Sequence, residues 1–356
     1  MGAIGTRAPL RVALGGGGTD LPSYYREHGG FVVSTAIDRY VQMLVSESFQ
    51  RRFRLKHLEL EEVDEPGGVQ HPILREALLR HWNGGPVELA SVADAPPGTG
   101  LGSSGAYAVC AIKALELAGG GDAAPGELAE AACAIEIDAL GRSVGKQDQY
   151  AAAFGGVRAY TFNADDSVDV RLLELSGEME RALRDEFLLF FSGRERSASD
   201  VLSGQVLGTQ AGDAAVGRAL DRIHELARAT CAALEEGDLQ RCGELMNEQW
   251  EAKRGRAPGT VIPELDDLRD VARRAGAQRI VVNGSFVTDK LEPNDVDCVL
   301  LIGPNFPHDS TAEAELLAGL PFINRELVDA EGFRQFTEKT FATDRNMIKK
   351  GLVEVI

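Results

Sequence analysis

Long apolar runs, paired cysteines and an excess of positive charge are all missing from this sequence. No stretch approaches the roughly 18 apolar residues that a membrane-spanning helix needs, and residues 1–10 lack the apolar core of a secretion signal. The five cysteines are an odd number, widely spaced and without a C-x-x-C pair, which favours free thiols in a reducing compartment. We therefore expect a cytoplasmic protein without a membrane segment.

Acidic residues outnumber basic ones by 55 to 37, which gives a formal net charge of −18. Such a surface repels nucleic-acid phosphates and anionic lipids, so we expect neither a nucleic-acid binder nor a membrane-surface binder. A small anionic substrate in a local basic pocket stays compatible with this charge. The 356 residues are enough for two or three domains at about 150 residues each.

Strand-like and helix-like runs are mixed, without a regular βαβ repeat, which predicts an α+β fold. Strands are expected at 11–14, 30–34, 40–47, 87–92, 157–162, 168–175 and 187–191, a hairpin at 51–63, and helices at 72–82, 103–118, 127–140, 215–236, 239–252 and 263–275. A loop and short helix are expected at 145–156. After residue 276 the pattern changes to strands at 279–282 and 296–302.

The strongest local signal is the glycine-rich turn at residues 94–106, which follows an expected strand and opens an alanine-rich helix. Its glycines let the backbone approach a ligand, and the free amides at a helix start attract an anion. Ser103 and Ser104 add hydroxyls for phosphate oxygens or Mg²⁺. No Gly-Lys-Ser/Thr follows, so this is not a Walker A loop. The simpler alternative is a turn with Ser103 as N-cap.

A second glycine cluster, at residues 15–18, lies between Arg11 and Asp20. A cation and a carboxylate at the two ends of one turn suit a sugar site, where the carboxylate accepts bonds from hydroxyl groups. Four glycines in a row are equally typical of a plain loop. This cluster alone does not decide between the two.

Residues 7–22, 97–106 and 136–156, taken in order, resemble the motifs of the GHMP small-molecule kinases, and most of all the D-glycero-D-manno-heptose 7-phosphate kinases. The resemblance runs from residue 7 to residue 277. It implies an ATP- and Mg²⁺-dependent kinase for the anomeric hydroxyl of a heptose 7-phosphate. It also implies a ribosomal S5 domain 2-like N-terminal domain and a ferredoxin-like C-terminal domain. A sugar phosphate and ATP are then the expected partners, and a homodimer is left open.

The resemblance also assigns roles to residues. Asp148 is implied as the base that accepts the hydroxyl proton, with Arg11 as its cationic partner. Glu136 and Ser104 are implied as magnesium ligands. The simpler alternatives are that Asp148 caps the following helix and that Glu136 lies on a solvated helix face. The implied ATP-binding residues are Pro97, Gly98, Gly100, Leu101, Gly102, Ser103 and Ser104, and the implied substrate-binding residues are Gly18, Thr19 and Asp20.

Arg194 and Arg196 follow an expected buried strand. Guanidinium groups bind phosphate through paired N–H bonds, so we predict that these two hold the phosphate of the substrate. A plain surface turn is equally compatible with the pattern.

The family's third, glycine-rich motif is absent after residue 277. The ferredoxin-like layer is therefore either incomplete or completed by strands from the tail. We place an N-terminal ATP-binding domain at 1–185, a truncated C-terminal domain at 186–277 and a tail at 278–356.

The tail resembles a small nucleotidyltransferase-like family. Gly284 and Ser285 form a Gly-Ser pair, and Asp295 and Asp297 stand two positions apart on an expected strand, so both carboxylates point to one side and can bind divalent metals. A hairpin with exposed acidic residues is the alternative, and Asp329 is a candidate for the third carboxylate. Two other functions stay open: a tail that transfers or binds nucleotides beside a degraded kinase, and a binding module without catalysis.

Overall fold

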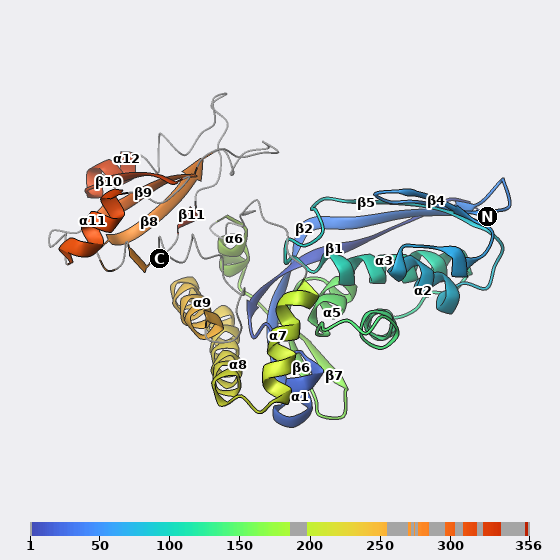
Figure 1. Ribbon diagram of the computed structural model, residues 1–356, viewed down its shortest axis with the longest axis horizontal. Coiled ribbons are helices and arrows are strands. Elements are labelled where there is room, and N and C mark those ends of the chain that lie inside the picture. The colour runs from blue at the N-terminus through green and yellow to red at the C-terminus, as the bar shows by residue number, and fades with distance from the viewer. Residues whose placement is uncertain are drawn as a thin grey trace. The chain divides into compact units, whose positions relative to one another are not determined.

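The computed structural model describes residues 2–185 and 198–254 and, beyond these, only parts of 270–354 (Figure 1). Contacts divide the chain into two compact units, Met1–Met179 with Glu195–Pro258, and Glu180–Arg194 with Gly259–Ile356. The domain boundaries that the sequence suggested, at 185 and 277, stay predictions.

A seven-stranded sheet forms the centre of the first unit, in the order β4-β3-β5-β2-β6-β7, with β1 paired to β2. Only the β3–β5 pair is parallel among these pairings. The predicted hairpin at 51–63 is confirmed by β3 and β4. The strands are β1 (Ile4–Gly15), β2 (Gly30–Glu47), β3 (Phe53–Lys56), β4 (Leu60–Val63), β5 (Val87–Ala93), β6 (Val157–Phe162) and β7 (Val168–Leu172).

The two strands predicted at 30–34 and 40–47 are in fact one strand, β2, of 18 residues. No glycine or proline lies between them to interrupt the extended backbone. Because β2 is long, it pairs with β1, β5 and β6 and links the two ends of the sheet.

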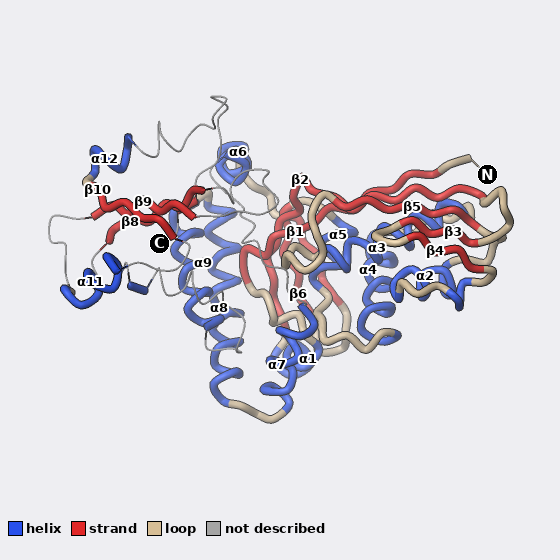
Figure 2. The backbone as a smooth tube through the Cα atoms, turned by 45° about the horizontal axis from the view of Figure 1, so that its top comes forward, coloured by secondary structure: helices blue, strands red, loops and turns tan. Residues whose placement is uncertain are grey.

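Helices cover one face of this sheet, as Figure 2 shows for α2, α3 and α4. The alanines of α3 at positions 106, 108, 111 and 114 are all buried, and such small side chains let a helix lie close to a sheet. The mixture of sheet and helices confirms the α+β prediction. The helices are α1 (Pro22–His28), α2 (Pro72–His81), α3 (Ser103–Ala118), α4 (Pro125–Cys133), α5 (Gln147–Phe154), α6 (Gly177–Asp185), α7 (Ala198–Gln210), α8 (Ala214–Glu236) and α9 (Leu239–Arg254), with a 3₁₀-helix at Pro66–Gly68 and a π-helix at Ala134–Ala139.

Helices α7, α8 and α9 reach the glycine cluster that ends β1. A Cβ added at Gly15 would lie 3.1 Å from the Cα atom of Ala227 in α8, so glycine is needed for this approach. The buried amide of Gln249 accepts a hydrogen bond from the Gly16 N–H at 2.9 Å, and that of Gln205 donates to the Gly18 carbonyl at 2.8 Å. The backbone of the glycine cluster is therefore fixed by side chains that are distant in the sequence, on α7 and α9. Helix α7, with two internal glycines, has no counterpart among the predicted helices.

The described strands of the second unit form a separate four-stranded sheet in the order β10-β9-β8-β11. Its register places Gly284 opposite Val296 and Asn283 opposite Asp297. Ser285 and Asp295 lie outside the described residues, so the tail site stays a prediction. The elements are β8 (Ala277–Gly284), β9 (Val296–Ile302), α11 (Ser310–Ala318), β10 (Ile323–Val328), α12 (Ala330–Gln335) and β11 (Val353–Glu354).

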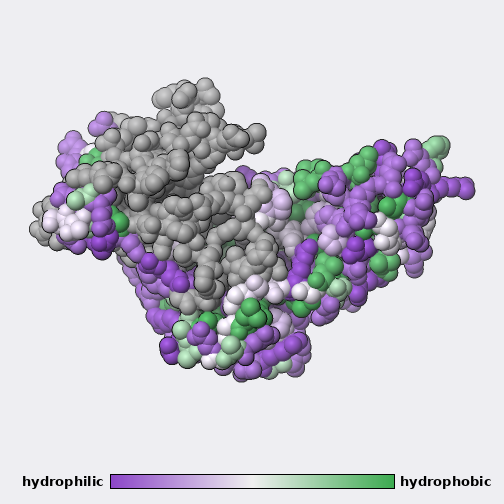
Figure 3. All heavy atoms as spheres, viewed as in Figure 1, coloured by the Kyte–Doolittle hydropathy of each residue, from purple (hydrophilic) through white to green (hydrophobic). Residues whose placement is uncertain are grey.

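The surface of the first unit is mostly hydrophilic in the view of Figure 3, with hydrophobic groups over β2 and β5, where Leu44 and Val92 are exposed. Four cysteines have described side chains, and all four are buried free thiols, as expected. Across the described part of the chain, no helix combines the length and apolarity needed to cross a membrane.

Candidate active site

The glycine-rich turn leaves its helix start open to a ligand. Gly98, Gly100 and Gly102 have φ angles of +79°, +77° and +74°, a left-handed backbone that favours glycine. Helix α3 begins at Ser103, and its N-cap is Gly102, so the alternative with Ser103 as cap is not observed. The first turn of α3 contains no acidic residue, and the N-cap supplies no side-chain acceptor. The first amides of α3 are therefore suited to an anion.

Asp148 lies directly against this turn. Its Oδ1 accepts bonds from two nitrogens of Arg11, Nε at 2.8 Å and Nη2, while the third nitrogen, Nη1, donates to the Gly100 carbonyl at 2.7 Å. A Cβ added at Gly102 would lie 3.2 Å from the Cγ atoms of both side chains. Both Arg11 bonds fall on Oδ1, and the Asp148 side chain is 25% exposed, so a small molecule can reach the carboxylate.

Asp148 is the second residue of α5, and the N-cap of that helix is Lys146. The alternative in which Asp148 caps the helix is therefore not observed. Gly105 of α3 makes the close approach of α5 to the turn possible, since a Cβ there would lie 2.8 Å from the Asp148 Cβ.

A β-bulge sets the position of Arg11. In the β1–β2 pair, Pro9 lies opposite Tyr40 but Arg11 lies opposite Ala36, so one residue of β1 faces three of β2. Such irregularities bend a strand and redirect its side chains. The Arg11 N–H also donates to the Leu101 carbonyl at 3.0 Å, which ties the bulge to the glycine-rich turn.

Glu136 stands on the π-helix and is fully buried, so the alternative of a solvated helix face is not observed. Its Oε1 accepts bonds from the Ser104 hydroxyl and from Arg142 Nη1 at 2.9 Å, and its Oε2 accepts from Gln149 Nε2 at 2.8 Å. Burial raises the pKa of Glu136, and the contacts with Ser104, Arg142 and Gln149 oppose that rise. The two predicted metal ligands are thus in direct contact.

The side chains of Ser104 and Glu136 fit a magnesium ion that binds together with a nucleotide. No cluster of three or more His, Cys, Asp or Glu side chains suited to a metal occurs among the described residues. Mg²⁺ in phosphoryl-transfer sites typically binds one or two protein oxygens and takes its other ligands from phosphates and water. Ser104 and Glu136 supply two such oxygens beside the phosphate turn.

The predicted sugar-binding residues Gly18, Thr19 and Asp20 are all buried inside the glycine cluster. The Asp20 carboxylate accepts bonds from the Gly18 N–H at 3.0 Å and from Gln147, through its backbone N–H at 3.2 Å and its Nε2 at 3.0 Å. Burial raises the pKa of Asp20. Contact with a sugar stays a prediction for these residues, and what they do in this structure is to join the cluster to α5.

Four glutamines and one arginine of the site were not singled out from the sequence. The adjacency of Gln147 and Gln149 to Asp148 is a usable signal, whereas the sequence gives no sign that Gln205, Gln249 and Arg142 reach the site. Arg194 and Arg196 lie outside the described residues, so their contact with a substrate phosphate stays a prediction.

A cavity of about 800 Å³ extends from the start of α3 to the β3–β4 hairpin. Ser103, Ser104 and Arg142 line one part of it, and Tyr107 and His71 line another. Pro97 also lines it, whereas the neighbouring glycines form the turn itself. A volume of this size is ordinary for a small-molecule site. It can hold a planar group beside the anion-binding turn.

His71 forms part of the aromatic wall of this cavity. Its ring stacks on Tyr107 with centroids 4.8 Å apart, and its Nδ1 accepts a bond from the Leu74 N–H at 3.3 Å as the N-cap of α2. Burial, helped by the nearby His57 and Arg142, lowers the pKa of His71 to about 4. The ring is therefore neutral near pH 7.

This lowered pKa predicts a loss of stability in mild acid. The unfolded chain takes up a proton on His71 at the ordinary pKa of 6.5, but the folded chain does so only near 4. The contribution of neutral His71 to the free energy of unfolding is therefore complete above pH 6.5 and is lost as the pH falls towards 4. His71→Asn keeps a good N-cap and removes the titration. Urea unfolding at pH 7.5 and 5.0 should show a larger loss for the wild type than for the variant, and equal losses would contradict the assignment.

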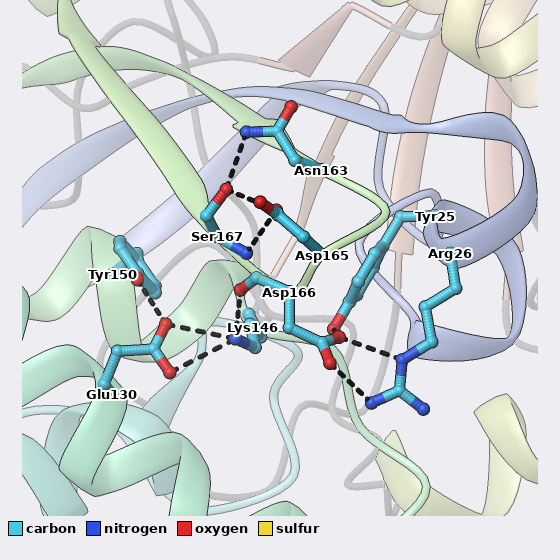
Figure 4. A network of polar contacts seen from close by, with 9 residues as sticks. All are labelled: Tyr25, Arg26, Glu130, Lys146, Tyr150, Asn163, Asp165, Asp166 and Ser167. Atoms are coloured by element: carbon cyan, nitrogen blue, oxygen red, sulfur yellow. Dashed lines mark hydrogen bonds and ion pairs between the residues drawn. The ribbon is translucent and has the colours of Figure 1, made fainter.

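A polar network holds the start of α5, where Asp148 lies (Figure 4). The buried ammonium group of Lys146 donates to both oxygens of Glu130, at 3.0 and 3.2 Å, and to the Asp166 carbonyl at 2.9 Å. The Tyr150 hydroxyl also donates to Glu130. The Asp166 carboxylate accepts bonds from Arg26 of α1 (Figure 4). Lys146 thus links α4, the β6–β7 turn and the start of α5, and the Asp166 carboxylate adds α1 to the network.

We expect Lys146→Met to destabilise the first unit by about 2–3 kcal/mol, because three charge-assisted bonds are lost and the Asp166 carbonyl loses a donor. Lys113→Met is the matched control. Lys113 pairs with the exposed Asp122 and also donates to the Ala123 carbonyl at 3.1 Å, but its side chain is more exposed than that of Lys146, so its loss should cost no more than about 1 kcal/mol. Urea unfolding measures both changes, and equal costs would show that the network does not hold the helix.

Comparison with known families agrees with this geometry. Residues 72–156 match the family model of the GHMP kinase N-terminal domain, a range that contains the glycine-rich turn, Glu136 and Asp148. Residues 72–156 therefore form a GHMP kinase N-terminal domain, and the enzyme is a phosphotransferase with an alcohol group as acceptor. GHMP kinases use ATP as phosphate donor. Residues 259–356 match DUF6932, a family of unknown function.

Relatives of this domain include sugar and mevalonate kinases. The chain is 26% identical to the D-glycero-alpha-D-manno-heptose 7-phosphate kinase of Campylobacter jejuni over 71% of its own length and 78% of that protein. It is 28% identical to the mevalonate kinase of Methanothermobacter thermautotrophicus, over 71% and 79%. The crystal structure of a D-glycero-D-manno-heptose 1-phosphate kinase from Bacteroides thetaiotaomicron superposes with a TM-score of 0.60 at 26% identity, covering 77% of this chain and 83% of that one.

Proposed function

We propose that the first unit transfers the γ-phosphoryl group of ATP to a sugar hydroxyl, and that this is the anomeric hydroxyl of a heptose 7-phosphate. One observation carries the proposal: the Asp148 carboxylate, paired with Arg11, lies against the glycine-rich turn at Gly102. A base and a phosphate-binding turn in contact are what phosphoryl transfer to an alcohol requires. The heptose kinases among the relatives support the choice of sugar.

Each part of the site has a role in this reaction. The amides at the start of α3 bind the nucleotide phosphates, and the adenine lies in the 800 Å³ cavity. Ser104 and Glu136 would hold Mg²⁺, which would supply positive charge beside the phosphates. Asp148 accepts the hydroxyl proton as the sugar oxygen bonds to the γ-phosphorus, and ADP leaves. Arg11 keeps Asp148 oriented and adds positive charge near the transferred group.

The acceptor test compares compounds that differ at the reacting hydroxyl. With radiolabelled ATP, a heptose 7-phosphate should be phosphorylated, its 1-deoxy analogue should not, and mevalonate should react poorly. Phosphorus NMR of the product should show a new anomeric phosphate. Equal labelling of the 1-deoxy analogue, or labelling of mevalonate alone, would exclude the proposed acceptor.

A second candidate function concerns the second unit. We propose that it binds a nucleoside triphosphate or transfers its nucleotidyl group, since the β8–β9 register brings Gly284 beside Val296, the residue before Asp297. Labelled nucleotide incorporation that is lost in Asp297→Asn, but kept in Asp148→Asn, would support it. No incorporation, together with no nucleotide-dependent thermal shift that depends on Asp297, would exclude it.

A further inference from the structure

Arg142 occupies the oxygens that the proposed function gives to Mg²⁺. Its Nη1 lies 2.9 Å from Glu136 Oε1 and 3.4 Å from the Ser104 hydroxyl. The Glu136 side chain is only 1% exposed, so this guanidinium is the cation that compensates a buried carboxylate. The Arg142 side chain itself is 29% exposed and therefore has an open side.

A magnesium ion and this guanidinium compete for the same oxygen. A carboxylate oxygen has two acceptor sites, and on Glu136 Oε1 these are taken by the Ser104 hydroxyl and Arg142 Nη1. A magnesium ion, which binds its ligands at about 2.1 Å in a nearly octahedral arrangement, therefore competes with Arg142 for this oxygen. Arginine does not lose its proton in proteins, so deprotonation cannot release Arg142 from the Glu136 carboxylate. It must move its side chain.

The surroundings show where the side chain can go. Arg142 lines the 800 Å³ cavity together with Ser103 and Ser104, which is the part next to the anion-binding turn. Its backbone is fixed, because its N–H donates to the Glu136 carbonyl at 3.0 Å and its own carbonyl accepts a bond from the Val144 N–H at 2.9 Å. A rotation of the side chain alone therefore takes the guanidinium from a carboxylate to the position of a phosphate.

We propose that Arg142 neutralises Glu136 until magnesium and nucleotide arrive, and that it then moves onto the nucleotide phosphates. This inference rests on the proposed function, because it uses the same metal and phosphate positions. Its consequence is that the metal alone binds weakly. Metal and nucleotide then bind with positive coupling, since the phosphates accept the cation that the metal displaces.

The test measures metal and nucleotide binding separately, without turnover. Mn²⁺ binding in the absence of nucleotide is followed by electron paramagnetic resonance, and MgADP binding by calorimetry. We expect Arg142→Gln to bind Mn²⁺ about tenfold more tightly and MgADP about tenfold more weakly than the wild type. Arg142→Met, which also removes the charge but keeps an aliphatic stem, should show the same opposite shifts if the first variant folds poorly.

Two controls make the result specific. Arg39→Gln removes a charge whose partner is the neighbouring exposed Asp38, and it should change neither affinity. Arg142→Lys keeps the charge and should bind Mn²⁺ as weakly as the wild type. Unchanged or weaker Mn²⁺ binding in both uncharged variants would overturn the inference. A wild-type protein that binds neither probe would instead contradict the proposed function.

Discussion

Replacing Asp148 by asparagine should lower kcat about 1,000-fold, within the range that a general base contributes. Asparagine keeps the size of the side chain and can still accept a bond from Arg11, but it cannot take up the hydroxyl proton. Binding of MgADP should stay within a few-fold of the wild type. Steady-state kinetics with a heptose 7-phosphate and calorimetry with MgADP measure the two quantities.

Asp38→Asn is the matched control, because it makes the same chemical change at an exposed ion pair with Arg39. Its kcat should be unaltered. If Asp148→Asn kept its kcat within about fivefold, general-base catalysis by this residue would be ruled out. The nearby Arg11 would then have to act on the phosphoryl group alone.

The second large effect is expected at Gly105, where α3 meets α5. A Cβ at this position would lie 2.8 Å from the Asp148 Cβ and 2.9 Å from the Gln149 nitrogen, so Gly105→Ala pushes the start of α5 away from the turn. A displacement of about 1 Å at a reacting group costs about 100-fold in rate. We expect that loss in kcat, together with a destabilisation of about 1–3 kcal/mol from overpacking.

Gly217→Ala provides the comparison, since a Cβ there meets nothing within 4 Å in helix α8. It should stabilise the protein by about 0.5–1 kcal/mol, because alanine is the better helix former. Its activity should not change. Wild-type kinetics in Gly105→Ala would show that the contact between the two helices does not position Asp148.

The phosphate turn could be predicted from its own residues, whereas the contacts between the motifs were predicted from the resemblance to the GHMP kinases. The glycine-rich turn at 94–106 contains both the amides and the serines, and the order of the motifs in the family linked it to Glu136 and Asp148. The structure brings Arg11 onto Asp148 and Ser104 onto Glu136. Roles such as base and metal ligand stay predictions, because a contact does not by itself identify a proton acceptor or a bound ion.

The features that the sequence did not predict depend on backbone irregularities or on distant partners. The bulge beside Arg11 and the π-helix that contains Glu136 interrupt the periods of two and 3.6 on which such predictions rest. Gln249 bonds to Gly16, 233 positions away in the chain, and no local sequence pattern predicts such a contact. The strand expected at 187–191 and most of the helix expected at 263–275 lie outside the described residues.

The amides of Gln205 and Gln249 also limit how far this enzyme can be shortened. They bond the Gly18 carbonyl and the Gly16 N–H, so an excised fragment without α7 and α9 would leave these backbone groups without their partners. The stretch that matches the kinase family, 72–156, lacks both glutamines and the whole of β1. A kinase excised for separate expression should therefore extend from β1 through Arg254, well beyond the stretch that matches the family.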